Sequence, residues 1–224
     1  MADLGNDDIG IESSSRLLRL KKMEKTLELL TKAAALPEAS GDVFARLGLV
    51  YSMAGKRDLA IAANRMAIKK NPENLAGYQY LAQLYLQDNQ ADEGIKILDE
   101  AAKQTKADAV YLIDLGETYT MFARAGKLDT VKARALDAFK RAAALKPTNP
   151  VLLQRLADGL GFLGDAESAA RLYSQLLERL PKLPGIRERL VELLIRRQDR
   201  TNAIIHLRTL VGDNPTSPQF NYLL

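Results

Sequence analysis

The chain has 224 residues with a net charge of +4, and 47% of them are hydrophobic. It has no cysteine, which excludes disulfides and thiolate chemistry, and its small net charge gives little support for nucleic acid or acidic membranes as partners. No apolar run approaches the 18 residues of a membrane span, and the acidic start lacks the pattern of a signal peptide. We therefore expect a cytoplasmic protein, or a periplasmic one if a leader has been removed.

The opening of the chain predicts a flexible leader over residues 1–12 and an N-terminal capping helix within 13–40. Serines at 13–15 offer an N-cap, and apolar residues then recur in threes and fours over residues 16–35. The opposite face of this helix is basic, and it carries Arg16, Arg19, Lys21, Lys22, Lys25 and Lys32. We interpret that face as the solvated side of an end cap, and a patch for an acidic partner is the alternative.

From residue 41 onwards the sequence repeats with a period of 34. Leu47, Leu81 and Leu115 are 34 apart, and so are Leu156 and Leu190, whereas 41 residues separate Leu115 from Leu156. A fixed period near 34 is typical of a helical solenoid. The repeats are placed at 41–74, 75–108, 109–149, 150–183 and 184–217, and 218–224 starts a further helix.

The third repeat holds an insertion of seven residues, expected around Ala123–Lys132. Seven residues make about two helical turns, so a helical hairpin can lengthen without rotating its apolar stripe. Proline ends the second helix of most repeats, as Asn71-Pro72 does in the first, because proline cannot continue the hydrogen-bond ladder. The pattern predicts five helical hairpins, the third of them longer than the rest.

The recurring residues resemble the tetratricopeptide repeat family. In the first repeat the matching residues are Phe44, Leu47, Gly48, Tyr51, Gly55, Ala60, Ala67 and Pro72. The fourth repeats them as Leu153, Leu156, Ala157, Leu160, Gly164, Ala169, Tyr173, Leu176 and Pro181. The sequence departs from the family at Asn64, where an aromatic residue is usual, and at Gly94, where alanine is usual. Over residues 41–217 the resemblance implies an all-α fold, a right-handed α-α superhelix of about five hairpins with capping helices.

The resemblance also implies a function, that of a non-catalytic scaffold or adaptor for protein–protein interaction. Such proteins bind a peptide or a partner helix in a concave groove lined by the first helix of each hairpin. The groove positions without a packing role are Ala45, Leu49, Met53, Gln79, Gln83, Leu86, Ile113, Glu117, Met121, Gln154, Asp158, Phe162, Glu188, Glu192 and Ile195. Many are apolar, and exposed apolar groups often mark binding surfaces.

The charges of these positions describe the expected ligand. The basic clamp with which some family members hold acidic carboxyl termini is absent, because its places carry Ala45, Leu49, Glu117 and Asp158. Glu117, Asp158, Glu188 and Glu192 make the carboxyl-terminal half of the groove acidic. We therefore expect an apolar or amphipathic peptide with basic residues towards that half.

Little in the sequence supports catalysis, a metal or a cofactor. His206 is the only histidine, so with no cysteine the chain lacks the nitrogen and sulfur ligands of a metal site. The glycine-rich fragment DGLGFLGD lies in an amphipathic helix and its turn, where a phosphate loop does not occur. We interpret the protein as a non-enzyme without cofactors. The alternative is a self-associating, structural segment of a larger protein or assembly, such as a bacterial secretion or pilus machine, acting through Phe220, Leu223 and Leu224.

Overall fold

The computed structural model describes residues 6–223, and it describes side-chain surroundings from Leu20 onwards except at Leu128. These residues form helices and no strand, which confirms the expected all-α helical-repeat fold. They divide into two compact units, Met1–Thr105 and Lys106–Leu224. Within residues 6–223, no helix has both the length and the hydrophobicity needed to cross a membrane.

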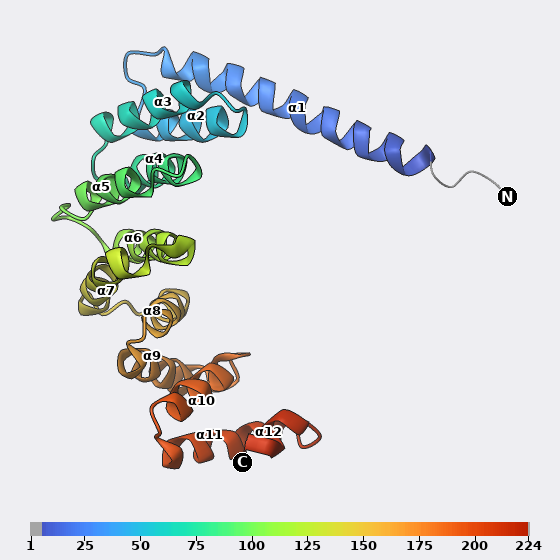
Figure 1. The fold of residues 1–224 in the computed structure, drawn as a ribbon, viewed down its shortest axis with the longest axis vertical. Helices are drawn as coiled ribbons and strands as arrows, with labels where there is room; N and C mark the ends of the chain where they lie inside the picture. The colour runs from blue at the N-terminus through green and yellow to red at the C-terminus, as the bar shows by residue number, and fades with distance from the viewer. Residues whose placement is uncertain (1–5, 224) are drawn as a thin grey trace. The chain divides into compact units, whose positions relative to one another are not determined.

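The first unit consists of one long helix and two helical hairpins (Figure 1). The long helix is α1 (Asn6–Ala34). The hairpins pair α2 (Gly41–Met53) with α3 (Arg57–Lys70), and α4 (Leu75–Gln87) with α5 (Ala91–Ala101). Helix α4 also packs against α2 and α3, so the second hairpin lies directly against the first.

Helix α1 begins at Asn6, inside the stretch expected to be a leader, and it packs against α2. Its residues Met23, Leu27 and Leu30 are half-buried, in line with the predicted stripe. On the basic face the described lysines are exposed, and Lys32 pairs with Glu28 at 2.5 Å. The side chains of Arg16 and Arg19 lie outside the described residues.

The second unit continues with three hairpins and a short last helix (Figure 1). Its first hairpin is α6 (Ala109–Phe122), a short π-helical segment η1 (Ala123–Lys127) and α7 (Leu128–Ala144). The next two are α8 (Pro150–Phe162) with α9 (Ala166–Arg179), and α10 (Ile186–Arg196) with α11 (Arg200–Asp213). Helix α12 (Pro218–Leu223) packs against α11.

A residue with a positive φ marks the turn of every hairpin, and these residues show where the insertion lies. They are Gly55, Asn89, Gly126, Gly164 and Gln198. The spacing is 34 from Gly55 to Asn89 and from Gly164 to Gln198, but Gly126 follows Asn89 by 37 and precedes Gly164 by 38. The seven extra residues are thus divided three before and four after the turn. Each arm of the third hairpin gains about one helical turn.

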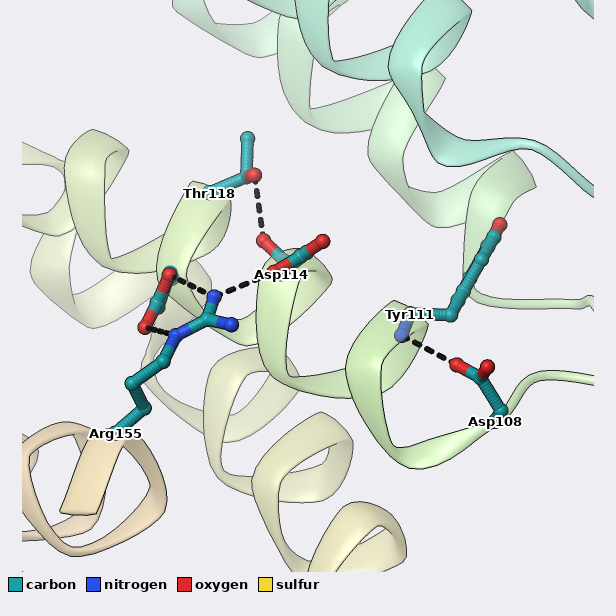
Figure 2. A network of polar contacts seen from close by, with 6 residues as sticks. Asp108, Tyr111, Asp114, Thr118 and Arg155 are labelled. Atoms are coloured by element: carbon teal, nitrogen blue, oxygen red, sulfur yellow. Dashed lines mark hydrogen bonds and ion pairs between the residues drawn. The ribbon is translucent and has the colours of Figure 1, made fainter. Parts of the chain in front are cut away.

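Several helices begin at a side chain that accepts a hydrogen bond from the first turn. Asn74 accepts from Ala76 N at 2.8 Å, and Asn149 accepts from Val151 N at 2.9 Å, at the start of α4 and α8. Asp108 accepts from Tyr111 N at 2.7 Å at the start of α6 (Figure 2). Such caps satisfy backbone N–H groups that have no partner within the helix. They fix where the first helix of these hairpins starts, and so which of its residues face outward.

Candidate partner-binding site

A hollow of about 380 Å³ lies between α6 and α8 in the second unit. We call it the α6/α8 hollow. It is lined by Glu117, Thr120, Met121, Arg124, Phe139, Arg155, Asp158, Gly159 and Phe162. Its volume falls within the range of about 300–1,000 Å³ in which ligand pockets occur. Its walls combine large apolar side chains with charged ones.

The base of the α6/α8 hollow is built around Phe139, which is fully buried. A Cβ atom on Gly159 would lie 2.3 Å from the ring's Cζ, and one on Gly116 would lie 2.7 Å from its Cε1. Only glycine therefore fits where α6 and α8 meet this ring. The glycines of DGLGFLGD thus include one that is required by helix packing.

Charged side chains on the rim are held by ion pairs between α6 and α8 (Figure 2). Arg155 donates from Nε to Glu117 Oε1 at 2.8 Å and from Nη2 to Glu117 Oε2 at 2.5 Å. Its Nη2 also donates to Asp114 Oδ1. The bond to Glu117 is the main cause that raises the pKa of the Arg155 guanidinium. The two bonds to one carboxylate fix the guanidinium plane as well as its position.

A related cluster joins α8 to the next two helices. Asp158 Oδ1 accepts hydrogen bonds from the Tyr173 hydroxyl on α9 and from Arg189 Nη1 on α10. Burial, and then the bond to Asp158, raises the pKa of the Tyr173 phenol, which therefore stays protonated as a donor. The cluster anchors α10 next to the α6/α8 hollow.

Two large apolar side chains remain accessible in this hollow. Phe162 is 46% exposed, and Met121 is half-buried. The Arg124 guanidinium lies 4.9 Å from the centre of the Phe162 ring, within the range of a cation–π interaction. Arg124 therefore holds one face of the ring.

The first unit has a smaller hollow of about 200 Å³ between α2 and α4. We call it the α2/α4 hollow, and it is lined by Leu49, Ser52, Met53, Tyr80, Gln83 and Gln87. No charged residue lines it within the described part of the chain, and Met53 is 70% exposed. Its chemistry is apolar and neutral, unlike the charged rim of the α6/α8 hollow.

The structure gathers seven of the predicted groove residues into these hollows. Leu49, Met53 and Gln83 line the α2/α4 hollow, and Glu117, Met121, Asp158 and Phe162 line the α6/α8 hollow. The others that are accessible lie outside both hollows, and they are Gln79, Leu86, Gln154, Glu188, Glu192 and Ile195.

Two predicted groove residues are buried, so their assignment to an open surface was wrong. Ala45 is 3% exposed and Ile113 is fully buried. Helix α6 has buried residues at most of its positions, including Thr118 and Thr120 as well as its apolar stripe. A helix covered on several sides has no free apolar face, and the spacing of one stripe does not reveal this.

The expectation of an acidic half of the groove also needs correction. Glu117 and Asp158 are paired with Arg155 and Arg189, so their charges are balanced locally. No ion pair of Glu188 or Glu192 is present among the described residues. The uncompensated acidic charge therefore lies on α10 alone.

Sequence reasoning missed the basic partners in the α6/α8 hollow. Arg155 and Arg189 precede the conserved-position leucines Leu156 and Leu190 and are themselves 34 apart. That spacing equals the repeat period, so it was an available signal that both arginines occupy one structural position. Arg124 falls in the inserted segment, where the repeat pattern gives no register.

The candidate residues for self-association are distributed differently. Phe220 packs against Val191, Leu207 and Leu210 within the second unit. Leu223 is 41% exposed, and Leu224 lies outside the described residues. Among the described residues, no group of three or more His, Cys, Asp and Glu side chains is placed to hold a metal ion.

No family model matches the chain. The rhomboid protease GluP of Bacillus subtilis (strain 168) is 35% identical over 79 residues, which are 35% of this chain and 16% of GluP. The match therefore spans about a sixth of the length of that relative.

Several solved structures share the fold. YrrB, a TPR protein with an unusual peptide-binding site, superposes with a TM-score of 0.58 and 14% identity, over 88% of this chain and 97% of its own. PilF of Pseudomonas aeruginosa has a TM-score of 0.52 and 19% identity, over 96% and 95% of the two chains. A tetratricopeptide repeat protein of Parabacteroides merdae has 0.51 and 15%, over 95% and 82%. The chain therefore has the fold of tetratricopeptide repeat proteins, as its sequence pattern implied.

Proposed function

We propose that this chain, a protein with the tetratricopeptide repeat fold, is a non-catalytic scaffold or adaptor that binds a peptide or partner helix at the α6/α8 hollow. The observation that carries the proposal is Phe162, a large aromatic side chain that stays 46% exposed beside Met121 at the mouth of a hollow. Rigid, partly exposed aromatic residues are typical anchors of protein interfaces. The likeness in fold to YrrB, which has a peptide-binding site, supports the same reading.

The fixed rim charges favour an apolar group as the part of the ligand that enters the hollow. Arg155 and Asp158 already have partners of opposite charge, so a ligand charge would have to displace them. Basic residues of the ligand are better placed towards α10, where Glu188 and Glu192 lie. Arg189 connects α10 to Asp158 at the hollow, so these glutamates are on a helix that adjoins it. The α2/α4 hollow would accept a neutral or apolar part of a ligand.

The test is a selection of peptides from a random library against the full chain, followed by affinity measurements on variants. Phe162→Ala is expected to weaken a selected peptide at least about tenfold, because central aromatic anchors carry much of the binding energy. Val151→Ala is the matched control, since Val151 is 63% exposed on the same helix and does not line the hollow. Peptides that bind the Phe162→Ala variant as tightly as the wild type would contradict the proposal.

Self-association through α12 is a second candidate function. Tyr222 is 89% exposed and Leu223 is 41% exposed on the same short helix, which leaves apolar surface open. We expect Leu223→Asp to abolish any concentration-dependent increase in mass seen by analytical ultracentrifugation. A wild-type chain that stays monomeric at high concentration would exclude this candidate and leave peptide binding unaffected.

A further inference from the structure

The largest groove of the second unit lies on the other helices of its hairpins. It has a volume of about 780 Å³ between α7 and α9, and we call it the α7/α9 groove. Its lining shares no residue with the α6/α8 hollow. Leu153 and Leu160 of α8 reach it from below, and Leu172 of α9 lines its side. Its floor is therefore apolar.

The rim of the α7/α9 groove is strongly basic. Lys140, Lys146, Arg171 and Arg179 line it and are all exposed, and no carboxylate is among its described lining residues. Of these four cations, only Lys140 has an acidic neighbour among the described ion pairs, namely Asp165 at 3.8 Å. At that distance and exposure the pair contributes little, so the charge of the rim is almost uncompensated.

The four cations form two pairs at opposite ends of the groove. Lys140 lies near Asp165 at the start of α9, on the same side as Arg171. At the other end Arg179 donates to the carbonyl of Thr148, close to Lys146. Arg171 and Arg179 are separated by eight residues, which is about 12 Å along a helix. A ligand that satisfies both ends needs two anionic groups separated by about that distance.

Lys146 has an unusual backbone conformation for its residue type. Its φ is +50°, a left-handed conformation that glycine or asparagine usually supplies after a helix. Its N–H bonds to the carbonyl of Ala143 at 3.0 Å, which closes the end of α7. A lysine there costs stability relative to glycine but places a positive charge on the rim of the groove.

We propose that the α7/α9 groove binds an acidic amphipathic segment of a partner protein. Apolar side chains of that segment lie against Leu153, Leu160 and Leu172, and carboxylates at its two ends meet the two pairs of cations. The separation of the pairs favours a peptide with several acidic residues over a ligand with one anionic head. This site is independent of the α6/α8 hollow, so the chain can hold two partners at once.

The test uses a fluorescein-labelled peptide, Glu-Glu-Ala-Leu-Leu-Ala-Leu-Glu-Glu, and the full chain in a fluorescence anisotropy titration. The peptide is expected to bind and to weaken as salt is added, while its counterpart with lysine for every glutamate does not bind. Arg171→Glu combined with Arg179→Glu is expected to lower the affinity at least about tenfold. Lys22→Glu combined with Lys25→Glu makes the same change of charge on α1 and is expected to change it less than about twofold.

Two further variants separate binding in the groove from general attraction between charges and from misfolding. Ala144→Trp fills the groove without changing any charge and is expected to weaken the peptide as the charge reversals do. Lys146→Gly is expected to raise the melting temperature, because it relieves the left-handed backbone, and yet to lower the affinity for the peptide. Circular dichroism verifies that each variant keeps its helicity.

Several outcomes would overturn the proposal. One is that Ala144→Trp leaves binding unchanged, since the peptide would then be held by charge outside the groove. Another is that the control reversal on α1 weakens binding as much as the reversal on α9. A third is that vesicles containing phosphatidylserine bind with the same dependence on Arg171 and Arg179 while the peptide does not, which would assign the groove to a lipid surface.

Discussion

Arg155 on α8 donates two hydrogen bonds to the carboxylate of Glu117 on α6, and one period later Arg189 on α10 donates to Asp158 on α8. The two arginines are 34 residues apart, so one position of the repeat links each first helix to the one before it. This link fixes the charged rim of the α6/α8 hollow and the relative position of its two walls.

The first prediction concerns the strength of this link. We expect a double-mutant cycle of Arg155→Gln and Glu117→Gln to give a coupling of about 1 kcal/mol in the free energy of unfolding, measured with urea. The value is modest because the Arg155 side chain is 30% exposed and that of Glu117 is 44% exposed, so water screens the pair. The coupling is expected to fall as salt is added. A coupling close to zero would show that the pair does not hold α6 against α8.

The second prediction concerns two glycines of α8. Gly159→Ala is expected to lower the free energy of unfolding by about 1–3 kcal/mol, because its Cβ would lie 2.3 Å from the Phe139 ring. Gly161→Ala is the matched control, since the nearest atom to its Cβ is 3.5 Å away. Alanine is favoured over glycine in a helix, so this variant is expected to be neutral or more stable.

Thermal and urea unfolding measure both glycine variants. Combining Gly159→Ala with Phe139→Leu is expected to restore part of the lost stability, because the smaller side chain makes room for the new methyl group. If Gly159→Ala were as stable as Gly161→Ala, the close approach of α8 to Phe139 would be wrong.

The third prediction concerns Asn64, which is fully buried on α3 with neither side-chain Oδ1 nor Nδ2 in a hydrogen bond. The residues 34 apart at the corresponding place of other repeats are apolar or aromatic, as at Leu98 and Tyr173 with Leu207. A buried polar group without a partner costs about 1–3 kcal/mol. We expect Asn64→Leu to raise the free energy of unfolding by about 1–2 kcal/mol.

The comparison for this prediction is Asn64→Ala, which removes the amide but leaves a gap beside Gly48. It is expected to be less stable than Asn64→Leu because the leucine fills the space. If both variants were less stable than the wild type, the amide would have a partner, such as a bound water, that stabilises it.

The repeat pattern predicted the all-α fold from particular residues, because the stacking of hairpins imposes one period on the packing positions. Leu47, Leu81 and Leu115 are buried or nearly so, as their shared register requires. The division of the insertion into one turn on each side of Gly126 was not predictable, since either helix alone could have absorbed seven residues.

The candidate site was less accessible to sequence reasoning. A 34-residue period identifies positions that face outward on average, but whether a neighbouring helix covers one of them depends on local packing, as the burial of Ile113 shows. Charges are also misread when their partners come from another repeat. Asp158 reads as free acid in the sequence, and only the fold brings Arg189 to it.

The last prediction concerns His206 on α11, whose Nδ1 lies 3.1 Å from Arg187 Nη1. Burial, and then the charge of Arg187, lowers the pKa of His206 below its ordinary value of 6.5. As the pH falls below 6.5, the unfolded chain takes up a proton that the folded chain still refuses, so the free energy of unfolding falls in that window. Urea unfolding at pH values on both sides of it is expected to show a smaller acid loss for His206→Gln than for the wild type. Arg187→Met is expected to reduce the loss partly, because it removes the second cause and leaves the burial. An equal acid loss in the wild type and in His206→Gln would contradict the assignment.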